Sequence, residues 1–442
     1  MSESYPIPVI IDTDPGVDDT IAILLALASP EINIEAFIAC FGQRPIYTQR
    51  AYADSSLNPG NSDLEANYVN ILKLYQAVHV HLEKHPDERT RFPNFSPDKK
   101  PTLAKGASVP LRNDANSTRT AQYFHGRDGL GDITSRHPEH SIGELFDPHP
   151  YLNITQKSGV DVALDILRSQ PPRSVTYIVL GPMTNLAQMM RRDGQLVRDR
   201  IGRIVSMGGA LDVPGNVSPV AEFNYYADPH AVKELLTSTK GLPLERFMML
   251  PLDITTPHEL PFPLYQEKID LAFRNASVPS LAFEKNPITH FTSSFLERTR
   301  DVMLEFGKDA MELHDIVAVW CAIVHRPFPE DKIMTLAEGW RAHARAFEVE
   351  CSGDLTRGML VVDRREDVAA YPLGTIRSEA QREPHKDQEH EKPPATEIDK
   401  ADMIDIVTGS AGHFPGVITI YKTPGPRALL EILFKRIWGI KL

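Results

Sequence analysis

Short apolar segments alternate with helical patterns along most of this 442-residue chain. Residues 8–12 predict a buried strand. The apolar run that follows Asp18 and Asp19 predicts a helix, because acidic side chains favour a first helical turn. Residues 32–40 predict the next strand. Such alternation is typical of the α/β class, in which helices cover both faces of a mainly parallel open sheet. In these sheets, ligands bind outside the carboxyl ends of the strands.

The same alternation continues downstream. The further strands that it predicts are residues 175–181, 203–209, 247–255 and 416–422. The further helices that it predicts are one capped near Thr184, one with Asp228 as its cap and Pro229 as its first residue, and residues 313–324 and 428–440.

We expect one domain over residues 1–442, elaborated by long loops. The polar stretches 44–66 and 83–101 contain turn-forming residues and predict loop insertions. Between residues 376 and 400, 12 of 25 residues are charged and three are proline, a composition typical of a disordered segment. We therefore expect a disordered insertion at about 366–402, inside the domain because apolar segments resume after it.

Composition argues against several classes of protein. The 47 Lys and Arg against 59 Asp and Glu give a formal charge of −12, unlike a nucleic-acid or anionic-membrane binding protein. The N-terminal residues do not resemble a signal peptide, and no stretch of about twenty apolar residues predicts a membrane span. Cys40, Cys321 and Cys351 are odd in number and far apart, so we expect no disulfide framework and a cytoplasmic location.

Four carboxylates lie within eight residues where the first strand meets the first helix, namely those of Asp12, Asp14, Asp18 and Asp19. A Pro-Gly pair between them turns the chain back on itself. Four repelling carboxylates in a small volume need a compensating cation or shifted pKa values. Oxygen ligands favour calcium or magnesium over zinc. The alternative, in which these residues only cap the helix, accounts for one or two of them but scarcely for four.

The segment DTDPGVDD at residues 12–19 resembles the signature of the inosine–uridine-preferring nucleoside hydrolase family. Further segments similar to the family's motifs follow in the family's order. They are GASVPL and HGRDGLGD within residues 106–132, LGPMTNLA at 180–187, MGGALDVPGNVSPVAEFNYYADPHA at 207–231, the pair His314-Asp315, and TRGMLVVD at 356–363. The resemblance is specific because several independent motifs occur in register from about residue 8 to 363.

This resemblance implies a calcium ion and a hydrolytic mechanism. The calcium ligands would be Asp14, Asp19, the backbone carbonyl of Leu180, and Asp315, with water and the ribose 2′- and 3′-hydroxyls completing the shell. Water beside the cation becomes more acidic, and Asp14 would remove its proton as general base. Attack on C1′ would pass through an oxocarbenium-like transition state.

The resemblance also implies how the ribose is held. Asp18 would bind the 2′-hydroxyl, and Asn216, Glu222 and Asn224 would bind the 3′- and 5′-hydroxyls. Such dense hydrogen bonding would reject a sugar that lacks a hydroxyl, since buried polar groups would then be left unpaired. The alternative for the last three residues is an ordinary polar loop.

The base-facing side of the implied site includes Met207 and Phe223, which would pack against the sugar or base. Simple core packing is the alternative for both. His314 would protonate the departing base, which a histidine can do near neutral pH, and a structural role at a helix N-terminus is its alternative. For His125, which the resemblance would bring near the mouth of the site, a structural role is favoured.

Two positions depart from the family's pattern. Gln43 stands where the family usually has an asparagine that contacts the ribose, and it keeps the amide on a side chain one methylene longer. The insertion that follows Gln43 leaves from the same strand end. Thr256 stands where a base-side histidine is often found. The sequence therefore leaves purine against pyrimidine preference open.

We predict a calcium-dependent hydrolase that cleaves the N-glycosidic bond of ribonucleosides, with no nucleic-acid or membrane partner, as a homodimer or homotetramer. One alternative is a non-catalytic nucleoside- or ribose-binding protein on the same scaffold. A second alternative is a haloacid-dehalogenase-type phosphatase. The segment IIDTD superficially resembles the DxD motif of that class, although Pro15-Gly16 does not suit it. A dinucleotide-binding enzyme is disfavoured because no GxGxxG follows the first strand.

Overall fold

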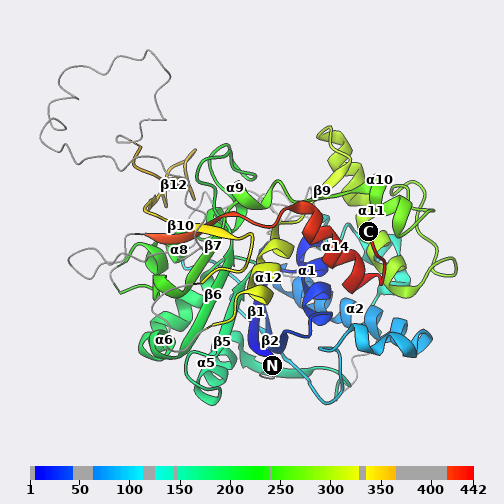
Figure 1. Ribbon diagram of the computed structural model, residues 1–442, viewed down its shortest axis with the longest axis horizontal. Coiled ribbons are helices and arrows are strands. Elements are labelled where there is room, and N and C mark those ends of the chain that lie inside the picture. The colour runs from blue at the N-terminus through cyan, green and yellow to red at the C-terminus, as the bar shows by residue number, and fades with distance from the viewer. Residues whose placement is uncertain are drawn as a thin grey trace, which may run out of the picture.

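The computed structural model of the protein describes residues 5–42, 63–112, 125–143, 148–238, 240–327, 335–364 and 416–442. Within these residues, nine strands form one sheet in the order β10-β13-β7-β6-β5-β1-β2-β3-β4 (Figure 1). Neighbouring strands are parallel except for the antiparallel pair β10 and β13. The strands are β1 (Ile7–Thr13), β2 (Ile32–Ala39), β3 (Thr102–Lys105), β4 (Asn153–Ser158), β5 (Val175–Val179), β6 (Ile201–Met207), β7 (Phe247–Leu250), β10 (Arg341–Arg345) and β13 (Val417–Lys422). The predicted fold class is confirmed.

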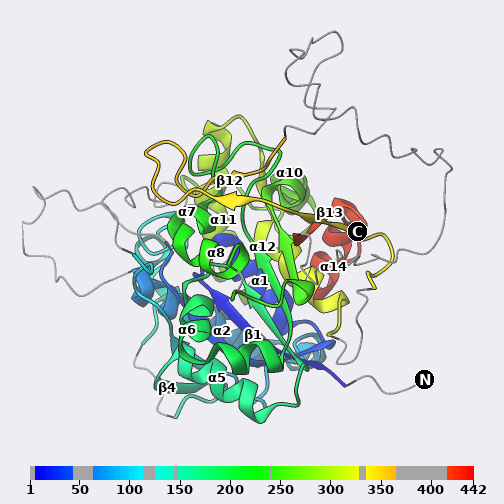
Figure 2. The ribbon, with the colours of Figure 1, turned by 90° about the vertical axis from the view of Figure 1, so that its left-hand side faces the viewer.

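Helices flank this sheet (Figures 1 and 2). The α-helices are α1 (Val17–Leu27), α2 (Asp63–Lys84), α4 (Ile133–Arg136), α5 (Gly159–Ser169), α6 (Thr184–Arg200), α7 (Phe223–Ala227), α8 (Pro229–Leu236), α9 (Leu252–Thr255), α10 (Phe262–Lys268), α11 (Pro287–Glu305), α12 (His314–Val324) and α14 (Pro426–Ile437). The 3-10 helices are η2 (Pro86–Arg91), η3 (Pro138–His140) and η4 (Leu244–Arg246). Two small sheets pair β8 (Glu259–Pro261) with β9 (Ala310–Glu312), and β11 (Glu348–Val349) with β12 (Leu360–Val361).

The sheet separates two buried apolar cores. In β1, Ile7, Val9 and Ile11 lie in one core and Ile10 lies in the other, because successive side chains of a strand point to opposite faces. The first core contains apolar side chains of α1, α2, α11, α12 and α14, and the second contains those of α5, α6 and α8. Helices therefore cover both faces, as the alternation predicts.

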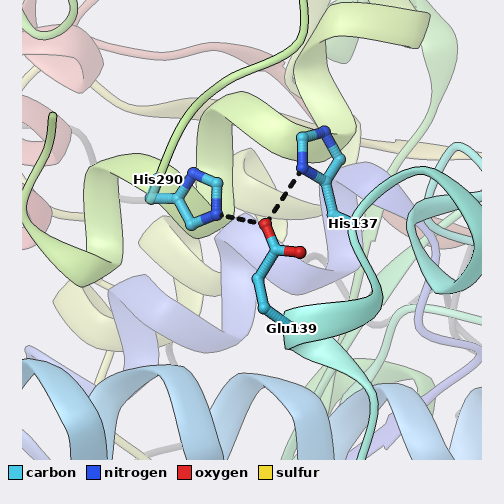
Figure 3. A group of neighbouring side chains, drawn as sticks. All are labelled: His137, Glu139 and His290. Atoms are coloured by element: carbon cyan, nitrogen blue, oxygen red, sulfur yellow. Dashed lines mark hydrogen bonds and ion pairs between the residues drawn. The ribbon is translucent and has the colours of Figure 1, made fainter. Parts of the chain in front are cut away.

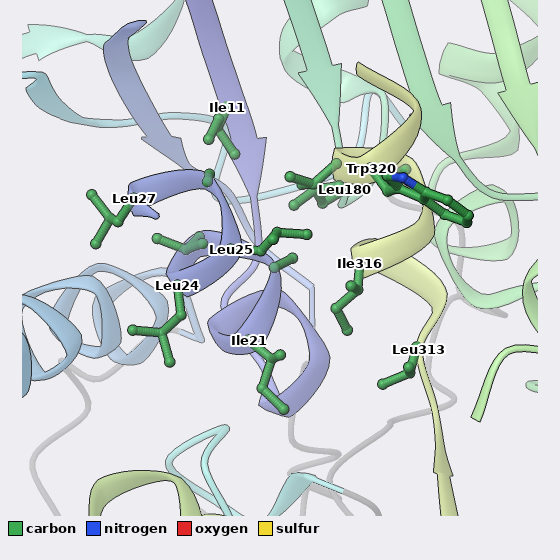
Figure 4. Packing of buried hydrophobic residues seen from close by; sticks show 14 of the residues in the cluster. Ile11, Ile21, Leu24, Leu25, Leu27, Leu180, Leu313, Ile316 and Trp320 are labelled. Carbon is green, nitrogen blue, oxygen red and sulfur yellow. The ribbon is translucent and has the colours of Figure 1, made fainter. Parts of the chain in front are cut away.

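Helices α1 and α12 pack against each other in the first core. Ile21 of α1 and Ile316 of α12 are fully buried there, in the same core as Ile11 of β1 (Figure 4). Both helices are almost wholly apolar on the inside and both begin with acidic residues in the first turn. Their packing places these two first turns close together at the carboxyl end of β1.

Most of the predicted elements are confirmed, including the cap of α8, where the Asp228 carboxylate accepts from the backbone N–H of Ala231 and Pro229 is the first residue. The strand predicted at 247–255 is wrong beyond Leu250. Pro251 follows, and because proline has no N–H to continue the sheet pairing, the chain turns there and begins α9.

The predicted insertions are only partly described. Residues 63–66, inside the stretch 44–66, form the start of α2. Phe92 and Phe95, inside the stretch 83–101, are buried in the first core. Gln43, residues 44–62 and the segment at 366–402 lie outside the described residues. Over the part of the chain that is described, none of the helices combines the length and apolarity needed to span a membrane.

Candidate active site

Asp12, the first of the four aspartates, is bound inside the sheet. Its carboxylate accepts from the Tyr177 hydroxyl of β5 at 2.9 Å and from Nδ2 of Asn185 in α6 at 2.8 Å. Burial raises its pKa to about 7, although these hydrogen bonds act in the opposite direction. Asp12 therefore connects β1 to β5 and α6, and both of its oxygens are engaged away from the other carboxylates.

Asp18, Asp19 and Asp315 come together where α1 and α12 begin. One carboxylate oxygen from each lies within 4.8 Å of the other two. Asp19 accepts from the Thr13 hydroxyl at 2.5 Å and from the backbone N–H of Gly16 at 3.2 Å, so its carboxylate is fixed against the strand–helix turn. The sequence places Asp315 some 300 residues from the other two, and only the packing of α12 on α1 brings it near.

Asp14 is 5% exposed and lies between two glycines. A Cβ atom on Gly42 would stand 1.6 Å from its Oδ2, and a Cβ on Gly181 would stand 2.5 Å from its Oδ1. Both distances are shorter than any real contact, so a side chain at either position would displace the Asp14 carboxylate. Gly42 follows β2 and Gly181 follows β5, the two strands that flank β1. The Asp14 carboxylate is therefore held in a narrow slot at the carboxyl end of the sheet.

The pKa values of these carboxylates are raised by burial and by mutual repulsion. Burial, and then the charges of Asp19 and Asp18, hold the pKa of Asp14 well above its usual range. The pKa of Asp315 is raised well above its usual value by the same two causes, and that of Asp18 is raised to about 6. A set of buried, oxygen-only, mutually repelling donors fits a hard divalent cation, which would remove the repulsion.

Leu180 continues β5 by one residue beside Asp14. Its N–H donates to the backbone carbonyl of Asp12 at 2.8 Å, and its own carbonyl accepts from Nδ2 of Asn224 at 2.6 Å. The same Nδ2 lies 3.3 Å from the backbone carbonyl of Met207, at the end of β6. Asn224 therefore links the ends of two neighbouring strands. The Leu180 carbonyl retains a second lone pair for another partner.

Glu222 caps α7 with both oxygens of a carboxylate that is 2% exposed. Oε1 accepts from the N–H of Asn224 at 2.7 Å, and Oε2 accepts from the N–H of Gly209 at 2.8 Å and of Tyr225 at 3.1 Å. Burial nonetheless raises its pKa. Glu222 therefore fixes the backbone of the loop that runs from the end of β6 to α7.

The predicted residues Asn216 and Phe223 lie at the outer side of this loop. Asn216 is exposed, and its Oδ1 accepts from the N–H of Phe223 at 2.9 Å. Phe223 is half-buried at the first position of α7, whereas Met207 is 3% exposed and belongs to the first core. Gln43 lies outside the described residues.

His314, the first residue of α12, is held through both ring nitrogens. Nδ1 lies 2.8 Å from the Thr255 hydroxyl and Nε2 lies 3.1 Å from Oε2 of Glu312. Burial lowers the pKa of His314, but the hydrogen bond to Glu312 and the charges of Asp18 and Glu222 outweigh it, so that the pKa is raised.

His125 and the glutamate that holds His314 complete the surroundings. Nδ1 of His125 accepts from the N–H of Val17 at 3.3 Å, in the first turn of α1. Burial, and then the neighbouring His314, lower the pKa of His125 to about 4, so the ring is neutral at pH 7. Glu312 also accepts from Nζ of Lys308 at 2.8 Å, and its pKa is lowered to about 2 because the bonds to His314 and Lys308 outweigh its burial.

Several of these residues were missed by sequence reasoning. Tyr177 and Asn185 lie inside predicted elements as ordinary core and helix residues, and only the strand order brings them onto Asp12. Glu312 carried a signal, since it stands two residues before His314 in a short segment whose alternate side chains share one face. Thr255 carried none, because the segment around it was predicted to be a strand.

Comparison with known proteins identifies the family. The family model described as inosine-uridine preferring nucleoside hydrolase matches residues 9–405 of this chain. The chain belongs to this family. Nucleoside hydrolases act on N-glycosyl bonds, so the chain is an enzyme of this hydrolase class.

Individual relatives extend over nearly the whole chain. The pyrimidine-specific ribonucleoside hydrolase RihA of Klebsiella pneumoniae is 30% identical over 377 residues, which cover 85% of this chain and 95% of the relative. The inosine-uridine preferring nucleoside hydrolase of Leishmania major is 26% identical over 363 residues, covering 81% and 88%. The structure of a purine-preferring ribonucleoside hydrolase from Gardnerella vaginalis shares the fold, with a TM-score of 0.60, 20% identity and 98% coverage of both chains.

Proposed function

We propose that this nucleoside hydrolase is a calcium-dependent enzyme that cleaves ribonucleosides to ribose and free base, with Asp14 as the general base. The observation that supports this most is the position of Asp14. Its carboxylate lies between Gly42 and Gly181, and burial together with the charges of Asp19 and Asp18 raises its pKa. A raised pKa makes a carboxylate a stronger base for a water molecule beside it.

The residues that would hold the cation are Asp14, Asp19, the Leu180 carbonyl and Asp315. All four offer oxygen, which suits calcium better than a softer metal, and Asp18 adds a fifth oxygen donor within the same cluster. When bound, calcium would supply a binding site for the ribose 2′- and 3′-hydroxyls and would make the attacking water more acidic. The hydrogen bonds from Thr13 and Gly16 keep Asp19 oriented towards this position.

Catalysis by the chain's own groups then has two proton transfers. Asp14 takes a proton from the water while the water oxygen bonds to C1′. The bond from C1′ to the base nitrogen breaks at the same time, and its electron pair leaves on the base. His314 supplies the proton that the base needs. Because Glu312 holds Nε2, Nδ1 is the nitrogen that passes the proton on, directly or through the Thr255 hydroxyl.

The ribose would be recognised by its hydroxyls. Asp18 would accept from the 2′-hydroxyl, and Asn216, Glu222 and Asn224 would bind the 3′- and 5′-hydroxyls. The Gln43 amide would contact the ribose, and Met207 and Phe223 would pack on the sugar or base. The backbone hydrogen bonds of Glu222 hold its carboxylate in one orientation, which supports a binding role for the whole loop. Pre-oriented acceptors of this kind discriminate against substrates that lack the matching hydroxyl.

The base preference stays unassigned. The relatives carry names that specify pyrimidines, inosine and uridine, or purines. We also propose a cytoplasmic homodimer or homotetramer. The cysteines Cys40, Cys321 and Cys351 are buried with free thiols, which suits a reducing compartment.

The experiment that tests this proposal is ribose release from a panel of purine and pyrimidine ribonucleosides, with calcium and again with excess chelator. We expect release that the chelator abolishes and that added calcium restores. Release that persists in chelator would contradict the role of calcium. Tight ribonucleoside binding without any release, by protein shown to be folded, would support the non-catalytic alternative.

A further inference from the structure

A second group of metal-ligand side chains lies outside the active site, between α11 and the segment from α4 to η3. His137 follows α4, Glu139 lies in η3, and His290 lies in the first turn of α11. One ligand atom from each lies within 4.8 Å of the other two. Figure 3 shows both imidazole rings directed at the Glu139 carboxylate.

The distances suit one small cation. Oε1 of Glu139 lies 2.8 Å from Nε2 of His290 and 3.3 Å from Nδ1 of His137 (Figure 3). Ligand atoms that share a tetrahedral zinc ion at bond lengths near 2.0–2.1 Å stand about 3.3 Å apart. The two distances to Glu139 therefore lie within about 0.5 Å of the separation that a shared ion requires.

The outer nitrogen of each histidine is held by a group that fixes its orientation. Nε2 of His137 lies 3.1 Å from Oε2 of Glu297, a carboxylate that is 1% exposed and that also accepts from Arg136 at 2.9 Å. Nδ1 of His290 lies 2.9 Å from the Ser280 hydroxyl. Metal-binding histidines are commonly held in this way, with the second ring nitrogen bound to a carboxylate or another polar group.

The contact with Glu297 decides which ring nitrogen of His137 carries a hydrogen. Glu297 is an acceptor, because Arg136 already donates to it, so Nε2 of His137 carries a hydrogen. In a neutral imidazole, Nδ1 then presents a lone pair to the Glu139 carboxylate. Two acceptors 3.3 Å apart repel each other unless a cation or a proton lies between them.

Access and ligand chemistry favour the cation. The side chains of His137 and His290 are 2% and 4% exposed, whereas that of Glu139 is 43% exposed, so Glu139 borders the solvent. Two imidazole nitrogens and one carboxylate suit zinc and similar transition metals, while calcium and magnesium prefer oxygen alone.

We propose that His137, Glu139 and His290 form a site for a zinc-type divalent cation, separate from the acidic cluster of the active site. The ion would tie α11 to the segment that begins at His125, the residue that contacts the first turn of α1. It would thereby fix the segment that borders the active site without taking part in the reaction.

The test uses the full chain with the active site kept saturated by calcium. Zinc binding is measured by titration and by metal analysis after gel filtration, and cobalt serves as a visible-absorbing probe of nitrogen ligation. We expect one equivalent of zinc per chain. Zinc at 100 times its Kd should raise the unfolding temperature by about 3 °C.

Glu139→Gln, at an exposed position, and His290→Gln should each weaken zinc binding by at least about tenfold and remove the thermal shift. The matched controls are Glu83→Gln, whose side chain is 62% exposed, and His140→Gln, whose ring lies against His290 but bonds through Nε2 to Ser294. Both controls should bind zinc as the unaltered chain does. No zinc equivalent in the unaltered chain, or zinc binding unchanged in Glu139→Gln, would overturn the site.

Discussion

Gly42 lies so close to Asp14 that a Cβ atom at this glycine would stand 1.6 Å from the carboxylate Oδ2. On the other side, a Cβ atom at Gly181 would stand 2.5 Å from Oδ1. Asp14, the general base that we propose, therefore has room for its carboxylate only because glycines follow the two flanking strands. This relationship lies between segments that are far apart in the sequence and depends on the strand order β5-β1-β2.

The substitution Gly42→Ala should displace the Asp14 carboxylate. We expect kcat/KM for ribose release to fall by about 100-fold or more, because a misplacement of about 1 Å has an effect of this size. The matched control is Gly143→Ala, since a Cβ there meets no atom within 4 Å. Equal activity of the two variants would show that the slot around Asp14 does not matter for turnover.

The substitution His314→Ala should slow the cleavage of ribonucleosides whose base needs a proton to leave. We expect kcat to fall about 10²–10⁴-fold, the range for loss of a general acid. On a riboside with a good leaving group, such as a nitrophenolate, the loss should be less than about tenfold, because that group leaves without protonation. A similar loss on both substrates would indicate a structural role for His314.

The substitution Asp18→Ala should reduce the preference of the enzyme for ribose over 2′-deoxyribose. The unaltered enzyme is expected to favour ribonucleosides strongly, because a buried acceptor is left unpaired when the 2′-hydroxyl is missing. We expect the ratio of kcat/KM values for a ribonucleoside and its 2′-deoxy analogue to fall at least about tenfold in the variant. If the ratio is unchanged while activity falls, Asp18 does not read the 2′-hydroxyl.

The pH dependence of stability should contain a contribution from His325, which caps the end of α12. Its Nδ1 donates to the Cys321 carbonyl at 2.9 Å and its Nε2 accepts from the N–H of Ala337 at 3.1 Å, so the folded protein needs a neutral ring. Burial lowers its pKa from 6.5 to about 4. At a pH between 4 and 6.5, His325 therefore binds a proton more tightly in the unfolded chain than in the folded chain.

This stabilisation is fully present above pH of about 6.5 and is lost as the pH falls towards 4. His325→Gln keeps one donor and one acceptor but does not titrate. From pH 7 to pH 4, the free energy of unfolding of the unaltered chain should therefore fall by up to about 3 kcal/mol more than that of this variant. His79→Gln, at a side chain that is 37% exposed, is the control. Parallel pH profiles for the unaltered chain and His325→Gln would contradict this assignment.

Local patterns predicted much of the fold, because burial and chain turning are local properties here. The junction from β1 to α1 follows from apolar residues, a Pro-Gly turn and acidic residues in the first helical turn. The same reasoning failed after Leu250, where an apolar run continues although Pro251 ends the strand. Periodicity alone does not distinguish a short strand from a short buried helix.

The candidate site was predictable only where it resembles known motifs. The acidic cluster was expected from the sequence, yet Asp12 turned out to be engaged by Tyr177 and Asn185, partners that depend on strand order. Thr255 holds His314 through a contact formed when α9 packs on α12, and no local pattern encodes that contact, whereas Glu312 stands only two residues before His314. Side-chain partners from distant elements follow from packing, which a sequence does not display directly.

The central claim, that Asp14 is the base, is tested most directly by ribose release from the Asp14→Asn variant in saturating calcium. The account predicts that the variant keeps the unfolding transition of the unaltered chain within a few degrees, and that release falls at least about 10³-fold for every nucleoside in the panel. A folded Asp14→Asn variant that releases ribose at the rate of the unaltered enzyme would contradict the account.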